Sequence, residues 1–326
     1  MDALTDLAGV APRREVVIPT DRGELEVLWT RHALDRRLGD VDVLHCNKQM
    51  VPVRSACPVV LTVHDLLLLD RPDDFVGAKA KLLPPLYRRS ILAANHWITA
   101  CESVAVDLRE RFSLPADRIT TIPLGASALD TVEAVRPEGV PDSFALVVGD
   151  LSPRKNVAYL ARLWSEVHEA TGLQLIAAGP EGWRSAQSRT ALRALEAAGL
   201  GRWLGRVTDE ELRWLYEHAR VVAVPSIAEG YGLAVVEAAS FGCPVVASEV
   251  PSLRAVAGDG VTTVSLAEPD RWIQALVEAA RPDGERPHAP RRTWAQAAQE
   301  VLAVYERVVA DTTGRDASRR VECTPT

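Results

Sequence analysis

The sequence of 326 residues is short of several features that would assign it to a common class of protein. It has five widely spaced cysteines and no Cys-x-x-Cys pair: Cys46, Cys57, Cys101, Cys243 and Cys323. This odd number predicts free thiols in a reducing cytoplasm. No apolar run reaches the ~18 residues of a membrane span. The first residues lack the basic region and apolar core of a signal peptide. We therefore expect a cytoplasmic protein without a transmembrane segment, and a peripheral membrane contact stays open.

Positive charge and metal-ligand spacings are also scarce. The chain has 37 Lys and Arg against 44 Asp and Glu, a net charge of -7, which argues against a general nucleic-acid binder. Asp40-Val41-Asp42 matches the metal-binding Asp-x-Asp of a different fold, but it precedes a predicted strand instead of following one. No other metal-ligand spacing is present, so we predict no metal site and no cofactor.

The length and the pattern along the chain predict two α/β domains. Apolar segments that read as strands alternate with amphipathic helices. The predicted strands span 41–44, 59–63, 96–100, 119–122, 144–149, 173–179, 221–224 and 245–247. This rhythm is typical of parallel sheets covered on both faces. We expect two Rossmann-like domains facing a cleft, with ligands at the carboxyl ends of the strands.

Proline and glycine positions suggest the domain limits. Residues 127–142 are polar and include Pro137, Gly139 and Pro141, which favours a linker there. We therefore divide the chain into a first domain over 1–136 and a second domain over 137–290. A terminal helix is predicted over 291–311, and the polar composition beyond it predicts a disordered tail over 312–326.

The most informative stretch is 225–239, where Glu229 and Glu237 flank a Gly-x-Gly turn that opens a helix. A helix N-terminus offers backbone N–H groups and a positive dipole end to a phosphate. Carboxylates accept hydrogen bonds from sugar hydroxyls. The combination favours a nucleotide sugar. The alternative is that both glutamates are solvated charges on the helix.

A second motif spans 147–156, where a strand ends at Gly149 and Arg154-Lys155 open the next helix. Two cations and backbone N–H groups at this point would stabilise the charge that develops on a diphosphate leaving group. The alternative is a basic helix start on the surface, which the helix dipole disfavours. His64 ends the predicted strand 59–63 and is a further candidate. Asp65 either orients the His64 ring or forms a turn or a helix cap.

Together these motifs resemble the retaining GT-B glycosyltransferases of family 4, also described as glycosyl transferases group 1. Glu229 and Glu237 match the family's two glutamates separated by seven residues. The resemblance implies that Glu229 contacts the donor sugar and Glu237 the ribose. It implies that Lys155 and Arg154 bind the diphosphate and that His64 lies near the reacting sugar. Catalytic roles are thereby assigned to His64, Lys155 and Glu229.

The remaining donor contacts come from the same resemblance. The turn of Gly230, Tyr231, Gly232 and Leu233 is expected at the phosphates, and Val207 lies where family members line the base pocket. Asp150 departs from the family, which often has an arginine directly after the glycine. The first forty residues do not fit the family either. One strand–helix–strand unit of ~30 residues is absent from this reading, so we expect a first domain shortened at its N-terminus.

The function that the resemblance implies is retaining transfer of a hexose (EC 2.4) from a nucleoside-diphosphate sugar. GDP- and UDP-linked donors both fit, and Pro153-Arg154-Lys155-Asn156 leans towards a GDP-mannose-like donor. The acceptor is a glycan, a lipid-linked saccharide or a small natural product. Two other functions remain open: a GT-B phosphorylase or epimerase, and a catalytically silent partner subunit, which a shortened first domain would favour.

Overall fold

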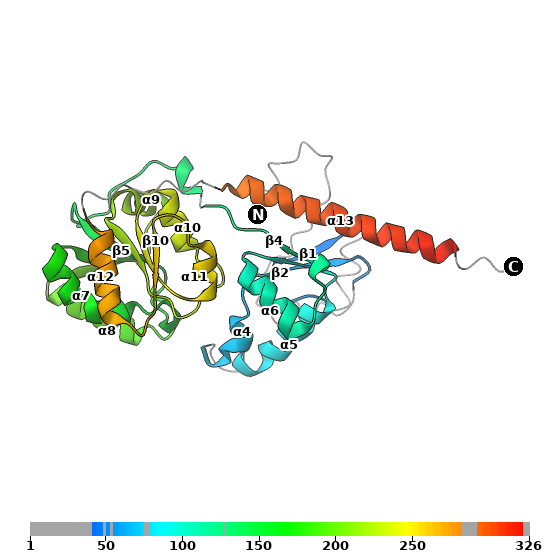
Figure 1. Cartoon of the computed structure of the whole chain (residues 1–326), viewed down its shortest axis with the longest axis horizontal. Coiled ribbons are helices and arrows are strands. Elements are labelled where there is room, and N and C mark those ends of the chain that lie inside the picture. The colour runs from blue at the N-terminus through cyan, green and yellow to red at the C-terminus, as the bar shows by residue number, and fades with distance from the viewer. Residues whose placement is uncertain are drawn as a thin grey trace. The chain divides into compact units, whose positions relative to one another are not determined.

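The computed structural model describes residues 41–47, 50–52, 55–74, 79–126, 128–281 and 292–321. The chain forms two compact units (Figure 1). Unit 1 comprises Met1–Leu124 and Trp294–Thr326, and unit 2 comprises Gly125–Thr293. Both are α/β units built on parallel sheets, so the predicted fold class is confirmed. The predicted shortening at the N-terminus concerns residues 1–40, which lie outside the described residues.

The described part of unit 1 holds a parallel sheet in the order β1-β2-β3-β4. Its elements are β1 (Leu44–Cys46), β2 (Val59–Val63), α4 (Leu67–Asp70), η2 (Pro72–Asp74), α5 (Lys79–Ala93), β3 (His96–Thr99), α6 (Glu102–Phe112), η3 (Ala116–Arg118), β4 (Ile119–Thr121) and α13 (Trp294–Val321). The strand predicted over 41–44 was placed too early. Leu44 is the first residue of β1 to pair with β2, opposite Val59.

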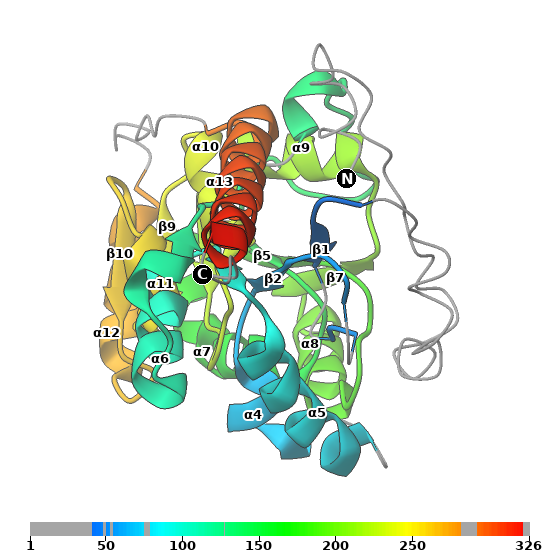
Figure 2. The same cartoon turned by 90° about the vertical axis from the view of Figure 1, so that its right-hand side faces the viewer.

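The terminal helix α13 covers one face of the unit 1 sheet, and α5 and α6 lie on the other face (Figure 2). Ala297, Val304 and Val308 of α13 pack against Val60, Ile98 and Ile122 in one buried cluster. Apolar contact with the sheet therefore holds this helix on unit 1. The rest of unit 1 ends at Leu124, and the whole of unit 2 lies between that residue and the helix in the sequence.

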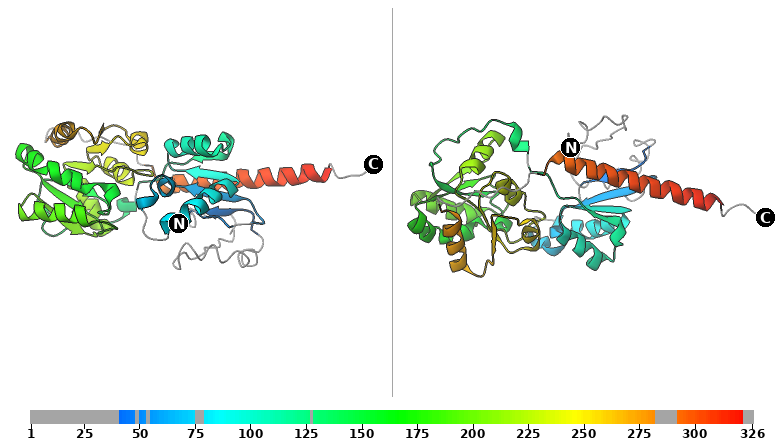
Figure 3. Two further views of the ribbon diagram at one scale, coloured as in Figure 1. Left: turned by 90° about the horizontal axis from the view of Figure 1, so that it is seen from below. Right: turned by 45° about the horizontal axis from the view of Figure 1, so that its top comes forward.

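The tail prediction was wrong for residues 312–321, because α13 continues as one helix to Val321 (Figure 3). No proline occurs in this stretch before Pro325, so no residue type that breaks a helix outright interrupts it. The Thr312 hydroxyl also donates to the carbonyl oxygen of Val308, one turn earlier, at 2.9 Å. Residues 322–326 lie outside the described residues.

Unit 2 holds a parallel sheet in the order β10-β9-β8-β5-β6-β7. Its elements are η4 (Ala128–Thr131), β5 (Phe144–Val148), η5 (Pro153–Lys155), α7 (Val157–Thr171), β6 (Gln174–Ala178), α8 (Ala186–Ala197), β7 (Gly201–Gly205), α9 (Asp209–His218), β8 (Val221–Val224), α10 (Leu233–Ser240), β9 (Val245–Ser248), α11 (Pro251–Val256), β10 (Val261–Val264) and α12 (Pro269–Ala279). The chain passes from β7 on one side of β5 to β8 on the other, so the strand order reverses between β5 and β8. Ligands of open α/β sheets bind at such a switch point, outside the carboxyl ends of the strands.

The inner strands β5, β6, β8 and β9 are buried on both faces, which explains why they are nearly continuous apolar runs. Alternate residues of each strand point to opposite faces. Ala145 and Val147 of β5 pack with α7, α8 and α12, whereas Phe144 and Leu146 pack with α9, α10 and α11. A one-residue slip of β5 would exchange these two sets, so the two cores fix the register of the central strand.

Local signals in the sequence set several helix ends. Thr208 and Glu211 form a reciprocal capping box at the start of α9, and Gly172 ends α7 in the left-handed region at φ +71°. Both are local signals of the sequence: a Thr with a Glu three residues later, and a Gly directly after the last helical residue. A cap of this kind stabilises a helix by about 1 kcal/mol, so these residues help to decide where each helix begins and ends.

The boundary between the units lies at Leu124, ahead of the predicted position after residue 136. The polar segment that follows is part of unit 2. Leu129 and Val140 are buried in its core, and the Arg213 guanidinium of α9 donates to the carbonyl oxygens of Leu129, Asp130 and Val132 at 2.7–3.5 Å. The polar composition predicted a linker here. The contacts that hold the segment to unit 2 use backbone carbonyl oxygens, which any residue type provides, so they could not be recognised in the sequence.

Candidate functional site

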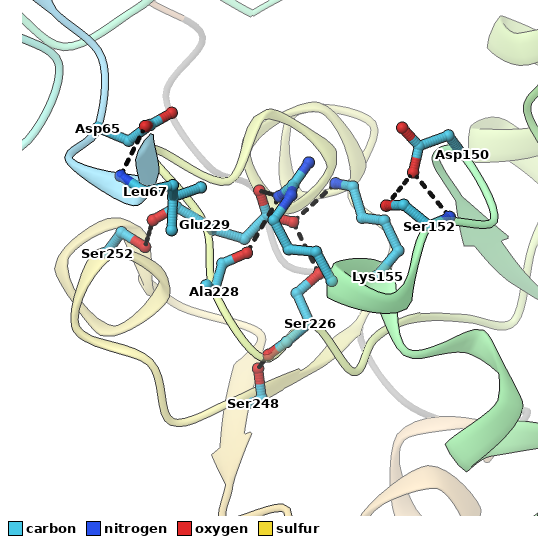
Figure 4. Close-up of polar contacts among 11 residues, drawn as sticks. Asp65, Leu67, Asp150, Ser152, Lys155, Ser226, Ala228, Glu229, Ser248 and Ser252 are labelled. Atoms are coloured by element: carbon cyan, nitrogen blue, oxygen red, sulfur yellow. Dashed lines mark hydrogen bonds and ion pairs between the residues drawn. The ribbon is translucent and has the colours of Figure 1, made fainter. Parts of the chain in front are cut away.

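Glu229 is the centre of a cluster of polar side chains at the carboxyl ends of β5 and β8 (Figure 4). Its carboxylate accepts hydrogen bonds at 2.7 Å from the Lys155 ammonium, the Arg154 guanidinium and the Ser226 hydroxyl. The Glu229 side chain is 7% exposed, against 17% for Lys155 and 25% for Arg154. The carboxylate is thus enclosed, while both cations keep one side open.

Backbone contacts hold the two loops that form this cluster. The Arg154 guanidinium also donates to the carbonyl oxygen of Ala228 at 3.0 Å, and the backbone N–H of Ile227 donates to the carbonyl oxygen of Arg154 at 2.9 Å. The Ser252 hydroxyl of α11 donates to the carbonyl oxygen of Glu229 at 2.7 Å. These hydrogen bonds therefore join the loop after β5 to the loop after β8. The two loops are more than seventy residues apart in the sequence.

Burial by itself would raise the pKa of Glu229, but the positive charges of Lys155 and Arg154 outweigh it and hold that pKa below its ordinary value. Glu229 is therefore ionised at neutral pH and forms a compact ion cluster with the two cations. A buried carboxylate without such partners would cost several kcal/mol.

The pH dependence of stability tests this arrangement. A carboxyl with a lowered folded pKa stabilises the protein above its unfolded pKa, and this contribution is lost as the pH falls through the folded pKa. We expect Glu229→Gln to lower the free energy of unfolding by about 2 kcal/mol at pH 7, the size of a hydrogen bond to a charged group. The difference from the wild type should shrink below about pH 4, under the unfolded value of about 4.3.

Denaturant unfolding of both proteins from pH 7 to pH 3.5 measures this difference directly. Arg189 and Glu181 offer a control, because they form an ion pair of the same 2.7 Å length with side chains 37% and 48% exposed. Glu181→Gln should change stability by less than about 1 kcal/mol at either pH. A constant difference for Glu229→Gln across the pH range would contradict the lowered pKa.

The loop after β5 presents the two cations through a series of turns. Gly149 has φ +140°, and Asp150 accepts hydrogen bonds from the backbone N–H and the hydroxyl of buried Ser152. Asn156 then adopts the left-handed conformation at φ +54° before α7 begins. Asp150, which stands where the resembled family often has arginine, is therefore a turn-forming residue that shapes the approach to Arg154 and Lys155.

Three glycines stand side by side where neighbouring strands end. Gly149, Gly179 and Gly205 follow or close β5, β6 and β7, and all have positive φ. The N–H of Gly179 donates to the carbonyl oxygen of Gly205 at 2.7 Å. A Cβ atom on Gly179 would lie 2.0 Å from the carbonyl oxygen of Gly149. The strands therefore end in closely packed backbone, which lets a ligand approach the main chain.

The Gly-x-Gly turn leads into α10 as the sequence predicts. Gly232 has φ +98°, and a Cβ atom there would lie 2.4 Å from Leu253 Cδ2, so both conformation and space require glycine. The first N–H groups of α10 have no carbonyl partner within the helix and lie at its positive end. Gly230 and Tyr231 belong to the same turn and are half-buried, and Leu233 at the helix start is exposed.

Glu237 lies one turn from the end of α10, with its carboxylate directed at a second helix. Glu237 Oε2 accepts a hydrogen bond from the hydroxyl of Tyr216, a fully buried residue of α9, at 2.9 Å. Burial raises the pKa of Glu237, and the Tyr216 hydrogen bond opposes that rise. Val207, just before α9, is half-buried against the same core.

His64 belongs to unit 1, where it follows β2 and is exposed. Asp65 accepts a hydrogen bond from the backbone N–H of Leu67 at 3.0 Å, which forms a turn just before α4, whose N-cap is Leu66. This contact agrees with the reading of Asp65 as a turn residue, and its orienting of the His64 ring stays a prediction. Unit 2 brings Arg154, Lys155 and Glu229 together, and the role of His64 stays a prediction.

Ser226 and Ser252 contribute to the Glu229 cluster, and Tyr216 binds Glu237, but none of the three was among the predicted site residues. Ser226 stands three residues before Glu229, and this spacing was a signal that could have been used. Tyr216 reads as a core residue of α9, because nothing in its own segment points to Glu237. Among the described residues, no group of three His, Cys, Asp or Glu side chains could hold a metal ion. In that same part of the chain, no helix is both apolar enough and long enough to cross a membrane.

Comparison with protein families identifies both units. The family described as "Glycosyl transferases group 1" matches residues 143–281, and "Glycosyltransferase Family 4" matches residues 2–128. The second match corrects our prediction that the first forty residues do not fit the family. That prediction relied on the apparent absence of one strand–helix–strand unit, whereas the family match includes all but the first of these forty residues.

Curated proteins give the same assignment. The chain is 30% identical to the "O-antigen chain mannosyltransferase B" of Escherichia coli over 74% of its own length and 66% of that protein. It is 26% identical to the "MMP alpha-(1->4)-mannosyltransferase" of Mycolicibacterium hassiacum, covering 91% and 81% of the two chains. It is 30% identical to the "D-inositol 3-phosphate glycosyltransferase" of Acidothermus cellulolyticus, covering 85% and 69%. The chain thus spans about two thirds to four fifths of these relatives.

Solved structures agree on the fold. WaaG, a glycosyltransferase involved in lipopolysaccharide biosynthesis, matches with a TM-score of 0.63 at 15% identity, covering 92% of this chain and 85% of WaaG. The sucrose-phosphate synthase of Thermosynechococcus elongatus matches with a TM-score of 0.61 at 20% identity, covering 95% and 82%. Family matches and relatives cover both units, so the chain belongs to the group 1, family 4 glycosyltransferases of the GT-B fold.

Proposed function

We propose that the protein transfers a hexose from a nucleoside-diphosphate sugar to an acceptor with retention of anomeric configuration. The observation that carries the proposal is the cluster of Glu229 with Lys155 and Arg154 at the carboxyl ends of β5 and β8. Two cations with open sides next to an enclosed carboxylate form a site that can receive a diphosphate and a sugar together.

The chemistry follows from these charges. As the bond between the sugar C1 and the diphosphate oxygen breaks, negative charge develops on the diphosphate. Lys155 and Arg154 stabilise that charge, as do the N–H groups at the start of α10. Glu229 accepts hydrogen bonds from the donor sugar. The acceptor oxygen forms the new bond to C1 on the same face, and its proton passes to the departing diphosphate.

Names of relatives favour a mannosyl donor. Two of the relatives are mannosyltransferases, and the Pro153-Arg154-Lys155-Asn156 sequence leans the same way. A GDP-linked donor is therefore our first expectation. A UDP-linked donor is the second, since one solved neighbour was crystallised with UDP and glucose. A glycan, a lipid-linked saccharide and a small natural product remain the acceptor classes. Cys46 and Cys57 are free thiols, which supports action in the cytoplasm.

Release of nucleoside diphosphate from a donor panel tests the function. The protein is incubated with GDP-, UDP-, ADP- and TDP-sugars, with and without candidate acceptors, and the released nucleotide is measured. We expect slow hydrolysis of one donor without acceptor, and a product whose anomeric configuration by NMR equals that of the donor. Inversion would contradict retention. Binding without turnover of any donor would indicate a silent partner, and conversion of the donor sugar in place would indicate an epimerase.

We also expect the activity to be independent of divalent metal ions. The proposal assigns neutralisation of the diphosphate to Lys155 and Arg154, which are protein cations and not removable by a chelator. The rate of donor consumption should therefore be unchanged in excess EDTA. Complete loss of activity in EDTA, restored by Mn²⁺ or Mg²⁺, would contradict this part of the proposal.

A further inference from the structure

Tyr216 and Glu237 form a hydrogen-bonded pair that the mechanism above does not use. The Tyr216 hydroxyl donates to Glu237 Oε2 at 2.9 Å, and the tyrosine is fully buried. Packing restricts the tyrosine ring, which lies parallel to the Phe241 ring with 6.0 Å between centroids. The hydroxyl is therefore held in one place and fixes the oxygen to which it donates.

The hydrogen bond from Tyr216 makes the two carboxylate oxygens of Glu237 different from each other. Oε2 is occupied by Tyr216, whereas Oε1 receives no hydrogen bond from any residue that the structure describes. Glu237 as a whole is half-buried, so it is not sealed inside the core. A carboxylate fixed through one oxygen presents the other in a defined direction, and that oxygen can accept from a hydroxyl group.

We infer that Tyr216 is a positioning residue that aims Glu237 at a ribose hydroxyl of the donor, so that the pair selects ribonucleotides over deoxyribonucleotides. The inference rests on the proposed function, and it takes the ribose role of Glu237 from the family resemblance. Ribose selectivity is an observable separate from turnover and from diphosphate binding. A site that hydrogen-bonds a hydroxyl binds the analogue without it more weakly, because its buried acceptor stays unpaired.

The expected effect is a change in a ratio of dissociation constants. The full-length protein should bind its preferred nucleoside diphosphate roughly 10- to 100-fold more tightly than the 2′-deoxy or 3′-deoxy analogue, as expected for one hydrogen bond to a charged group. Tyr216→Phe should reduce that ratio by about tenfold. Inorganic pyrophosphate, which has no ribose, should bind the variant and the wild type equally.

Tyr159→Phe is the matched control. The Tyr159 hydroxyl is buried in the same unit, but it packs against Trp272 of α12 and has no hydrogen-bond partner in the described part of the chain. This substitution should leave the ratio unchanged. The double variant Tyr216→Phe, Glu237→Gln gives a second reading, because loss of Tyr216 should have no further effect once the carboxylate is gone.

The pH dependence of ribose selectivity distinguishes a positioning role of the Tyr216 hydroxyl from a role in packing alone. Glu237 faces Tyr216 and Asp209 of α9 and Lys155 of the β5 loop. Burial and Asp209 raise the pKa of Glu237, whereas Tyr216 and Lys155 lower it. Without the Tyr216 hydroxyl, the pKa of Glu237 rises further. Ribose selectivity should then be lost at a higher pH in Tyr216→Phe than in the wild type, and Tyr159→Phe should not move it.

The experiment is isothermal titration of GDP, UDP, ADP, TDP, the deoxy analogues and pyrophosphate into each variant, well below its melting temperature. A reduced ratio and a shifted pH limit in Tyr216→Phe alone would support the inference. An unchanged ratio in Tyr216→Phe would overturn it, as would an equal loss in Tyr159→Phe. A wild-type protein that binds none of the nucleoside diphosphates GDP, UDP, ADP and TDP would instead overturn the proposed function.

Discussion

Lys155→Ala is expected to lower kcat for sugar transfer by about 10²-fold or more, while the protein stays folded. The Lys155 ammonium lies 2.7 Å from Glu229 and is partly exposed, and the proposed function assigns it to the diphosphate. Charge on the leaving group develops mainly in the transition state, so the loss should fall on kcat more than on KM. Glu229 keeps Arg154 and Ser226 as donors, which preserves the enclosed carboxylate.

Lys81→Ala is the control for this variant. Lys81 is exposed on α5 of unit 1, and its removal also deletes one lysine charge. We expect no change in kcat for Lys81→Ala. Steady-state kinetics with the donor identified by the panel, together with melting curves for both variants, make the comparison. Full activity in Lys155→Ala would remove this residue from the mechanism.

Gly179→Ala is expected to destabilise unit 2 by about 3 kcal/mol or more. Gly179 has φ +144°, a conformation that side chains rarely adopt, and the added Cβ would lie 2.0 Å from the Gly149 carbonyl oxygen. Backbone must therefore move at the ends of β5 and β6. For a domain of this size the melting temperature should fall by about 6–12 °C.

Gly199→Ala separates the cost of the positive φ from the cost of the backbone clash. Gly199 also has positive φ, at +72°, but nothing lies within 4 Å of the added Cβ. It should cost about 1 kcal/mol, or 2–4 °C. Differential scanning calorimetry of both variants makes the measurement. Equal losses would show that the backbones of Gly149 and Gly179 are not in the close contact described here.

Much of unit 2 could be predicted because its signals are local. The capping box of Thr208 and Glu211, the end of α7 at Gly172 and the strand over 221–224 depend on residues within a few positions of one another. The candidate site was found for the same reason. Arg154-Lys155 and Glu229 each follow the end of a predicted strand. Each also has turn-forming glycines within a few residues in the sequence.

The parts that could not be predicted depend on distant contacts. Tyr216 is separated from Glu237 by twenty-one residues and lies on another helix, so its segment reads as core alone. Arg213 donates to three carbonyl oxygens more than eighty residues away. These hydrogen bonds hold the predicted linker on unit 2. Backbone acceptors leave no trace in side-chain patterns, and composition therefore placed the domain boundary too late.

Thermal stabilisation of the wild-type protein and of Lys155→Ala by nucleotide sugars tests the central claim most directly. A ligand at a hundredfold excess over its Kd adds about 2.7 kcal/mol, or about 5–10 °C for a domain of this size. We predict such a rise for one of the GDP-, UDP-, ADP- and TDP-sugars with the wild type, and a much smaller rise with Lys155→Ala. No rise with any of the four donors, or the same rise in both proteins, would contradict a donor site built on Glu229, Lys155 and Arg154.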